Sequence, residues 1–282
     1  MVNFQLDEMQ EMLKELAHQF AVEEIRPHAE HWDTESIYPK EAIQSAHEMG
    51  LLNLHIGEEY GGPGLGSMEE VLVNEELAWG DPGFATAAYA TSLACAPIIT
   101  GATEEQKQMW LGKVAQEGAL ASYAVTEPGA GSDVAACKTT AVRDGDEYII
   151  NGSKMWITGA GYADFFFVLA KTDVDAGYKG MSGFIVESDA EGFSLGKKEV
   201  NMGQRCSDTR SIQFDDVRIP ANQLIGGSES GGWMNAMKAF DMSRPNIAAH
   251  ATGLARAAYE HALQYSSERS TFGKPLHNHQ AI

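Results

Sequence analysis

The sequence predicts an α+β protein with several domains: an N-terminal helical domain, a central antiparallel β domain and the start of a C-terminal helical bundle. The first 118 residues carry the hydrophobic periodicity of helices. Short apolar segments separated by Gly and Asp turns follow, and helical periodicity returns after Gly231. We therefore expect domains at 1–118, 119–226 and 227–282, the last of them incomplete.

The N-terminal region has the pattern of consecutive helices. Apolar residues spaced by four, three and four predict a first helix that ends before Pro27: Met9, Leu13, Leu16 and Phe20. Further helical windows follow at 40–49, 68–78 and 85–100. Thr103 and Gln106 fit a capping box that opens another helix. The segment Tyr60–Gly64 interrupts the periodicity and predicts a loop.

Strand patterns dominate between residues 119 and 226. Asp144-Gly145 and Asn151-Gly152 are both type I′ turn signals, so we expect two consecutive hairpins. The segments with strand character predict a compact antiparallel domain: Thr139–Arg143, Glu147–Ile150, Lys154–Thr158, Phe165–Ala170, Gly183–Glu187 and Ser211–Phe214.

The C-terminal region predicts one long helix and part of another. Trp233, Met237 and Phe240 share a face, which an apolar stripe continues past an irregularity at Pro245: Ile247, Ala251, Leu254 and Ala258. The last residues, from about Arg269, have the pattern of a second long helix with nothing to pack it. Because an exposed apolar helix face is unfavourable, we expect the chain to be a fragment of a longer protein.

Composition and charge restrict the class of protein. With 282 residues and 44% hydrophobic content, the chain can bury a substantial core. Forty acidic against twenty basic residues give a net charge of −20, which disfavours nucleic acid and anionic membranes as partners. No apolar run approaches the length of a membrane span. No metal site is expected, because the histidines of the N-terminal region lack ligand spacing: His18, His28, His31 and His47.

The cysteines and the N-terminus indicate a reducing compartment. Cys95, Cys137 and Cys206 are odd in number and unpatterned, so neither a disulfide framework nor a zinc site is expected. The segment Met1–Glu8 has no basic, apolar or Arg-rich character typical of a targeting signal. We expect a bacterial cytoplasmic protein or, as the alternative, a mitochondrial matrix protein after removal of a transit peptide.

The stretch Tyr123–Val134, with Met155–Thr158 downstream, predicts a flavin site. Glycines on either side of Ala130 let the backbone approach a ligand closely, and short hydroxyls with one aromatic plane suit a flat polar ring. The alternatives are an ordinary surface turn and, for Trp156 alone, a core position. A dinucleotide fingerprint is rejected, because Val134 replaces its third glycine and strands follow.

Six motifs in order resemble the acyl-CoA dehydrogenase family, closest to its medium-chain members: YAVTEPGAGSDVA, KMWIT, NMGQRCSDTR, FDMSRP, RSTFGKPL and HQAI. The resemblance covers the whole chain and implies FAD as cofactor. It implies α,β-dehydrogenation of an acyl-CoA thioester to trans-2-enoyl-CoA in fatty acid β-oxidation, with electrons passed to an electron-transferring flavoprotein. It also implies a homotetramer.

The resemblance implies two groups of cofactor-binding residues. In the first, Trp156 would pack on the isoalloxazine and the Thr158 hydroxyl would lie near N5, where hydrogen bonds favour the reduced flavin; its members are Tyr123, Val125, Thr126, Gly131, Ser132, Trp156, Ile157 and Thr158. The second would reach the pyrophosphate and ADP of FAD in a neighbouring subunit: Arg269, Ser270, Thr271, His279 and Gln280.

Substrate contacts are implied at Ser132, Asp241, Ser243 and Arg244, with Arg244 near the adenine and ribose of CoA. The alternatives are that Ser132 caps a turn and that Arg244 only pairs with Asp241 at i, i+3.

The implied reaction requires a general base. In the medium-chain branch this glutamate would lie beyond Ile282, and other branches place it where Ser243 stands here. Serine cannot serve unaided, so we expect these 282 residues alone to bind FAD weakly and to show no turnover. The rival hypotheses are a non-catalytic flavin- and acyl-CoA-binding subunit of a heteromer and an acyl-CoA oxidase-like or desulfinating homologue.

Overall fold

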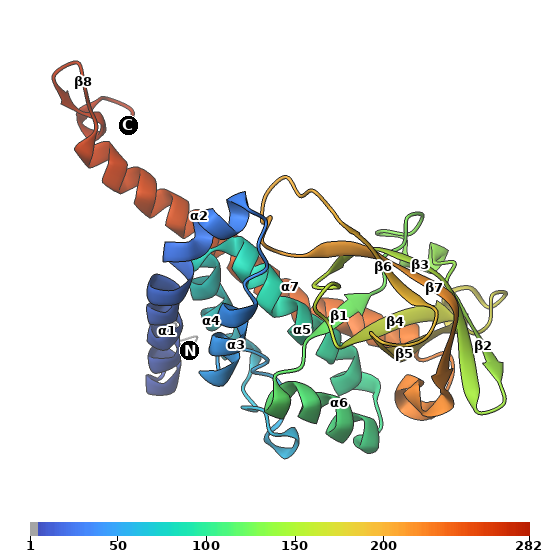
Figure 1. The fold of residues 1–282 in the computed structure, drawn as a ribbon. Coiled ribbons are helices and arrows are strands. Elements are labelled where there is room, and N and C mark those ends of the chain that lie inside the picture. Colours follow the sequence, from blue (N-terminus) through green and yellow to red (C-terminus); the bar gives the residue numbers. More distant parts are fainter. Residues whose placement is uncertain (1–4) are drawn as a thin grey trace.

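The computed structural model describes residues 5–282, in which a helical domain and a β domain pack against one long helix (Figure 1). Residues 1–4, part of the segment assessed for a targeting signal, lie outside the described residues. The helices are α1 (Glu8–Phe20), α2 (Arg26–Thr34), α3 (Lys40–Glu48), α4 (Ser67–Gly80), α5 (Pro82–Gly101), α6 (Glu104–Glu117) and α7 (Gly232–Glu268). The strands are β1 (Ala121–Ala124), β2 (Thr140–Asp144), β3 (Glu147–Thr158), β4 (Phe165–Lys171), β5 (Met181–Glu187), β6 (Phe193–Lys198), β7 (Thr209–Pro220), β8 (Ser270–Thr271) and β9 (Lys274–Pro275).

The helices α1, α3, α4, α5 and α6 lie where the hydrophobic pattern predicts them. The capping box of α6 is present: the Gln106 N–H donates to Thr103 Oγ1 over 3.3 Å, and the Thr103 N–H donates to Gln106 Oε1 over 3.0 Å. The sequence prediction missed α2. A π-helical turn, Ala21–Ile25, leads from α1 into α2. Pro27 is tolerated in the first turn of α2, because the N–H donor that proline lacks is not required there for an α-helical hydrogen bond.

Helix α5 corrects one expectation about membranes. This helix of 20 residues is long and apolar enough to cross a bilayer, whereas the sequence prediction is that no apolar run approaches that length. However, 78% of the relevant window is buried inside the protein. It is the core helix of the N-terminal domain, packed between the β domain and α7.

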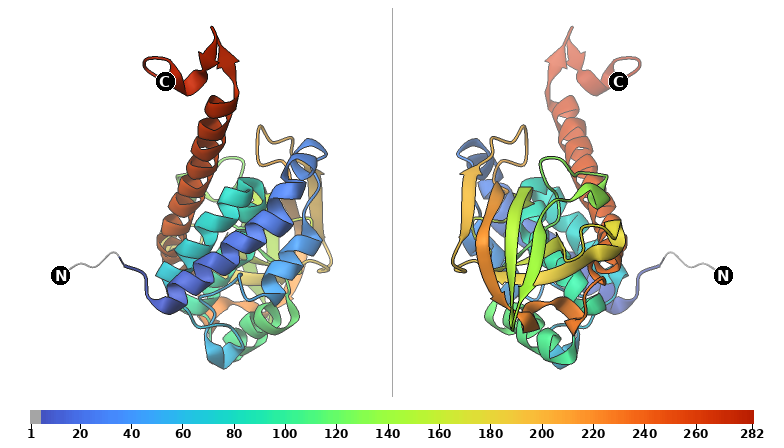
Figure 2. Two further views of the ribbon diagram at one scale, coloured as in Figure 1. Left: turned by 90° about the vertical axis from the view of Figure 1, so that its left-hand side faces the viewer. Right: turned by 90° about the vertical axis from the view of Figure 1, so that its right-hand side faces the viewer.

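The seven-stranded sheet has the order β1-β4-β2-β3-β7-β6, with β5 paired to β4. Most pairs are antiparallel, but β4 runs parallel to β1 and, at the single pair Thr140 and Lys171, to β2, which the sequence did not predict. Alternate residues of β4 enter two different cores, so the strand is buried on both faces. One core, containing Phe165 and Phe167, lies against α5, α6 and α7; the other, containing Phe166 and Val168, fills the interior of the β domain (Figure 2).

Only one of the two predicted hairpins forms. β2 and β3 pair across the Asp144-Gly145 turn, as predicted. The second prediction was wrong, because β3 passes straight through Asn151 and Gly152. A β-bulge occurs there: the Asn151 side chain exchanges hydrogen bonds of 2.8 and 2.9 Å with Asp216 on β7, and Gly152 has φ 145°. The Asn151-Gly152 pair therefore lies at a bulge in a long strand and does not form a turn.

Helix α7 is continuous through Pro245, where an irregularity was expected. The first part of the predicted apolar stripe packs against a core, as expected: Trp233, Met237 and Phe240. Its continuation past Pro245 lies on the exposed side, since Ile247, Ala251, Leu254 and Ala258 all face solvent. The buried side is instead formed by small and polar residues: Ser243, Asn246, Ala249, His250 and Gly253. The apolar periodicity therefore located the helix and its core contact as far as Phe240, but it indicated the wrong face after Pro245.

The chain after α7 forms a small hairpin, not a second long helix. β8 and β9 pair across Phe272 and Gly273, whose φ values of 49° and 79° are both positive, as a two-residue type I′ turn requires. Pro275 lacks the N–H that a helix interior needs. Turn chemistry therefore overrides the weak helical pattern of these residues.

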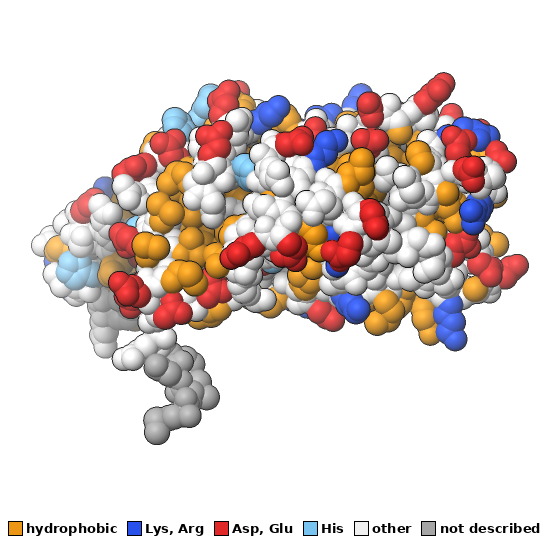
Figure 3. Space-filling view, turned by 90° about the horizontal axis from the view of Figure 1, so that it is seen from below, with side chains coloured by type: hydrophobic (Ala, Val, Ile, Leu, Met, Phe, Trp, Pro, Cys, Tyr) orange, Lys and Arg blue, Asp and Glu red, His pale blue; other side chains and the backbone are white. Residues whose placement is uncertain are grey.

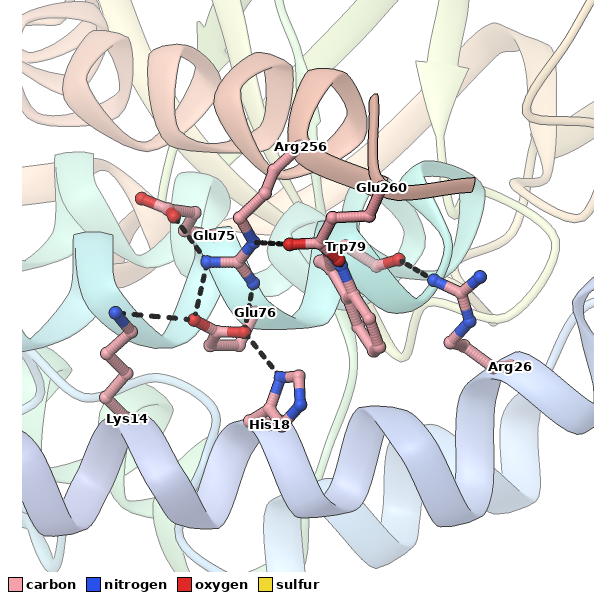
Figure 4. Close-up of polar contacts among 8 residues, drawn as sticks. All are labelled: Lys14, His18, Arg26, Glu75, Glu76, Trp79, Arg256 and Glu260. Atoms are coloured by element: carbon pink, nitrogen blue, oxygen red, sulfur yellow. Dashed lines mark hydrogen bonds and ion pairs between the residues drawn. The ribbon is translucent and has the colours of Figure 1, made fainter. Parts of the chain in front are cut away.

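A cluster of charged side chains joins α7 to α4 and α1 (Figure 4). The Glu76 carboxylate is almost completely buried, and Arg256 on α7 donates to both of its oxygens. His18 Nδ1 lies 2.8 Å from Glu76 and Lys14 Nζ 3.8 Å from it. The indole N–H of Trp79 donates to Glu260 over 2.7 Å, and the Arg26 guanidinium lies over the Trp79 ring. These contacts fix the middle of α7 on the helical domain.

Candidate functional site

The two motifs predicted to bind a flavin lie on adjoining segments. The Met155 N–H donates to the Thr126 carbonyl over 2.9 Å, and the Ser122 hydroxyl donates to the Thr158 carbonyl over 2.7 Å. The end of β3 is thereby held beside β1 and the residues that follow it. The candidate flavin surface, defined as Thr126, Gly131, Ser132, Trp156 and Thr158, is thus assembled from segments that are about thirty residues apart in the sequence.

Trp156 has a strained backbone conformation. Its φ is 62°, in the left-handed region that large side chains rarely adopt. The pairing of β3 with β7 shifts between Lys154 and Ile157, so Trp156 lies in a β-bulge. Its side chain is 56% exposed. Strained residues of this kind concentrate at ligand-binding sites, and an exposed indole offers a planar surface for an aromatic ring.

The glycine loop presents backbone groups to solvent. Glu127 and Ala130 exchange hydrogen bonds of 3.0 and 3.1 Å, which closes the turn. Side chains built on Gly129 and Gly131 would meet open space. Within residues 5–282, the N–H groups of Gly131, Ser132 and Asp133 donate to no other protein group. Free N–H groups, a hydroxyl and the neighbouring indole fit the polar edge and phosphate of a flavin nucleotide.

Three residues predicted to bind the cofactor have side chains that point into the protein. Val125 and Ile157 are buried in the two cores, so only their backbone groups could reach a ligand. The Tyr123 ring stacks on Phe167, and its hydroxyl donates to the Ala236 carbonyl over 3.1 Å. Burial raises the pKa of Tyr123, so the phenol stays neutral.

The sequence reasoning missed a buried ion pair beneath the candidate flavin surface. Lys154 is fully buried, and its ammonium lies 2.9 Å from the Glu127 carboxylate. Burial raises the pKa of Glu127, but Lys154 together with hydrogen bonds from Cys137 and Thr139 outweighs burial and lowers it to about 2. A lysine among the inward-facing residues of β3 was the available signal, since the buried positions on either side of it, Ile150 and Ile157, are apolar.

The predicted substrate residues on α7 differ in exposure. Ser243 is buried, and its hydroxyl donates to the Phe240 carbonyl over 3.1 Å. Asp241 and Arg244 are about 70% exposed and form the i, i+3 ion pair that was the alternative explanation for Arg244. That pair does not compete with ligand binding, because an exposed ion pair contributes little free energy.

The residues predicted to bind the pyrophosphate and ADP of FAD lie far from the candidate flavin surface of the same chain. Arg269, Thr271, His279 and Gln280 belong to the hairpin segment beyond α7, which projects away from the β domain (Figures 1 and 2). His279 Nε2 lies 3.1 Å from the Thr271 carbonyl, which ties the two ends of this segment together. Their predicted role at a neighbouring subunit stays a prediction.

A separate cavity of about 660 Å³ lies between α3, α5 and the end of α6, and none of the predicted site residues line it. The surface charges that border it, including Lys40, Glu48 and Lys113, are of both signs. Among residues 5–282 no group of three His, Cys, Asp or Glu side chains could hold a metal ion.

Comparison with known proteins decides the family. Residues 7–118, 122–217 and 230–282 match, in order, the N-terminal, middle and C-terminal domains of acyl-CoA dehydrogenases. The chain belongs to the acyl-CoA dehydrogenase family. It is 46% identical to a probable mitochondrial medium-chain specific acyl-CoA dehydrogenase 2 of Caenorhabditis briggsae, over 100% of this chain and 69% of the relative.

Solved structures of acyl-CoA dehydrogenase type agree with this assignment. A chain from a study of the electron transferring flavoprotein of Acidaminococcus fermentans superimposes with a TM-score of 0.96 at 39% identity, covering 99% of this chain and 74% of that one. A glutaryl-CoA dehydrogenase from Mycobacterium smegmatis in complex with FADH2 gives 0.90 at 32% identity, covering 98% and 69%. The predicted family and fold class are confirmed, as is FAD as the cofactor of the family, which comprises flavoprotein oxidoreductases of fatty acid metabolism.

Proposed function

We propose that this chain forms the flavin- and acyl-CoA-binding part of an acyl-CoA dehydrogenase that prefers medium-length straight acyl chains and passes electrons to an electron-transferring flavoprotein. The observation that carries the proposal is the juxtaposition of Thr126, Trp156 and Thr158 beside the open glycine loop. The similarity to a medium-chain relative supports the substrate class. The match to a chain from an electron transferring flavoprotein study supports the acceptor.

Different residues of the chain would bind different parts of FAD and of acyl-CoA. The Thr126 and Thr158 hydroxyls and the loop N–H groups would hydrogen-bond the flavin edge and phosphate, and the Trp156 ring would cover the isoalloxazine. Bound FAD would accept the β-hydrogen of the thioester as hydride. Ser132, Asp241 and Arg244 would bind the CoA moiety, and Ser243 would contribute to the substrate site from its buried position on α7. The FAD of a neighbouring subunit in a homotetramer would be bound by Arg269, Thr271, His279 and Gln280.

The proposed location of the protein is a bacterial cytoplasm or, as the alternative, a mitochondrial matrix. The proposed domain boundaries are at 118/119 and 226/227.

The rival proposal of a non-catalytic binding subunit is favoured by one observation. Ser243 stands where a branch of the family would carry the base, and its hydroxyl is bonded to a helix carbonyl. Serine in that position removes no α-proton unaided.

Two measurements test the proposal. Purified protein titrated with FAD should show a perturbed visible flavin spectrum that saturates, and absence of any binding would refute the flavin site. Ferricenium reduction with octanoyl-CoA should then show no turnover by these 282 residues alone, and robust turnover would contradict that part of the proposal. Oxygen consumption with octanoyl-CoA would instead support the oxidase-like alternative.

A further inference from the structure

The buried ammonium of Lys154 lies at a seam in the β sheet. β1 pairs with β4 only as far as Ala124 and Val168, and β2 meets β4 only at Lys171. Between these points no strand within residues 5–282 pairs with this edge of β4. The chain leaves β1 here to form the glycine loop, so the seam lies directly under the candidate flavin surface.

Lys154 supplies the hydrogen bonds that a strand would otherwise make. Its ammonium donates to the Leu169 carbonyl on β4 over 2.7 Å and to the Val125 carbonyl after β1 over 3.2 Å. The third contact is with Glu127 Oε1, over 2.9 Å. An ammonium has three N–H donors, and here they face one oxygen on β4 and two in the segment that follows β1.

Glu127 extends the same junction to the start of β2. It accepts hydrogen bonds from the N–H groups of Lys138 and Thr139 over 2.6 and 3.0 Å, and from the Cys137 thiol over 2.8 Å. Cys137 Sγ also lies 3.4 Å from the Lys154 ammonium. One buried carboxylate therefore fixes both ends of the loop that runs from Glu127 to Thr139.

The position of the pair links it to the residues that would meet the flavin. Thr126 lies between Val125 and Glu127, both of which are held by Lys154, and the Thr126 carbonyl accepts from Met155, the residue next to Lys154. Trp156 follows in its bulge. A buried ion pair is weak evidence for stability, since apolar residues of similar volume often serve as well. Its contribution here is geometric.

We propose that Lys154, paired with Glu127, is a positioning residue that holds Thr126 and Trp156 in the conformation able to receive the isoalloxazine. The inference rests on the proposed flavin site. It predicts that the pair matters more for flavin binding than for folding.

The decisive variants are Lys154→Met and the double variant Lys154→Met/Glu127→Gln. The single variant leaves Glu127 buried and unpaired, so it loses both thermal stability and FAD affinity. The double variant removes both charges and regains most of the thermal stability that the single variant loses, short of the parent's because the Leu169 and Val125 carbonyls lose a donor. Its Kd for FAD nevertheless stays at least about tenfold weaker than the parent's, and its visible circular dichroism of bound flavin differs. Lys107→Met, which breaks a surface pair with Glu104, is the matched control and changes neither property.

The result that overturns the inference is a double variant with the parent's Kd and flavin circular dichroism. Amide hydrogen exchange without FAD gives a second readout that separates this inference from the proposed function. The Met155 and Ala130 amides should exchange faster in the double variant than in the parent and in Lys107→Met. Unchanged exchange would refute positioning by Lys154, whereas failure of the parent to bind FAD would refute the flavin site itself.

Discussion

At the scale of single residues, strain and buried polarity mark the site more clearly than composition does. Trp156 combines a left-handed backbone, a bulge and an exposed ring. Each feature costs free energy or exposes apolar area, and none is needed for the sheet to form. A residue that keeps all three is best explained by a ligand that uses the ring.

Replacing Trp156 with glycine should therefore separate folding from binding. Glycine adopts positive φ without strain, so the free energy of unfolding of the apo protein should change by less than about 1 kcal/mol. The Kd for FAD should rise by about tenfold or more, because the stacking surface is lost. Ser36→Gly, which relieves a similar φ of 55° outside the site, is the control and should leave the Kd unchanged. Equal FAD affinity in Trp156→Gly and the parent would show that the ring is not a flavin contact.

His250 makes a second prediction at this scale. It lies on the buried side of α7, where Nε2 is 3.1 Å from Asn74 Oδ1 within a network that includes Glu70 and Asn246. Burial lowers the pKa of His250 from 6.5 to about 4, although the nearby Glu70 carboxylate opposes the shift. The folded state therefore binds this proton less readily than the unfolded chain. Stability from this group is fully present above pH 6.5 and is lost as the pH falls to about 4.

The corresponding experiment is urea unfolding of His250→Gln and the parent at pH 7 and pH 4.5. The glutamine keeps a donor for Asn74 but does not titrate, so its loss of stability on acidification should be smaller by about 2.5 kcal/mol. His28→Gln, at an exposed histidine on α2, should behave like the parent. Parallel pH dependence in all three proteins would contradict the assignment of a depressed pKa to His250.

At the scale of elements, local sequence signals located most helices and strands. Which structure a given signal forms, however, depends on the elements that pack against it. The Thr103 capping box needs only four residues, and it was predicted and found. Asn151-Gly152 carries the same turn signal as Asp144-Gly145, but pairing of β3 with β7 across twelve residues of each strand makes it a bulge. The exposed stripe of α7 likewise depends on which helices pack against it, and no spacing within α7 contains that information.

Gly152 tests this distinction between a bulge and a turn. A Cβ at Gly152 would lie 2.7 Å from Thr139 Cα, whereas one at Gly145 would meet nothing, although both glycines have positive φ. Gly145→Ala should cost about 1 kcal/mol of stability from backbone conformation alone. Gly152→Ala should cost at least about 2 kcal/mol, because the backbone of Thr139 must also move. Thermal or chemical unfolding of both variants checks the order, and equal losses would contradict the bulge geometry.

The cluster of Figure 4 gives the corresponding prediction for helix packing. Arg256→Gln removes the main partner of the buried Glu76 carboxylate, so it should reduce the free energy of unfolding by about 2 to 4 kcal/mol. Arg218→Gln removes two ion pairs whose members are about half exposed, and it should cost less than about 1 kcal/mol. A loss in Arg256→Gln no larger than that in Arg218→Gln would show that α7 is held by other contacts.

At the scale of the whole molecule, the sequence could indicate only those parts of the candidate site that lie within a short continuous segment. The glycine loop and Trp156 could be proposed as site residues from the sequence, because each lies in a short motif. Lys154 and Glu127 were not, because their roles appear only when β1, β3 and β4 are placed together. Acidic side chains are spread over the face shown in Figure 3, in keeping with the net charge of −20, and they form no single patch that would reveal a binding surface.

The exposed stripe of α7 carries the last prediction. Ile247 and Leu254 on this stripe are each about half exposed, and further along the same helix Tyr259 and Leu263 are 66% and 54% exposed on its other sides. Apolar area of this extent is rarely left in water, and the proposed homotetramer would cover it between subunits. Leu254→Glu places a charge in that interface and should lower the molar mass measured by light scattering. Val142→Glu makes the same change at a residue on β2 that is 62% exposed, and it should leave the mass unchanged. A parent protein that is already monomeric, or equal masses in both variants, would mean that α7 is not the surface through which subunits associate.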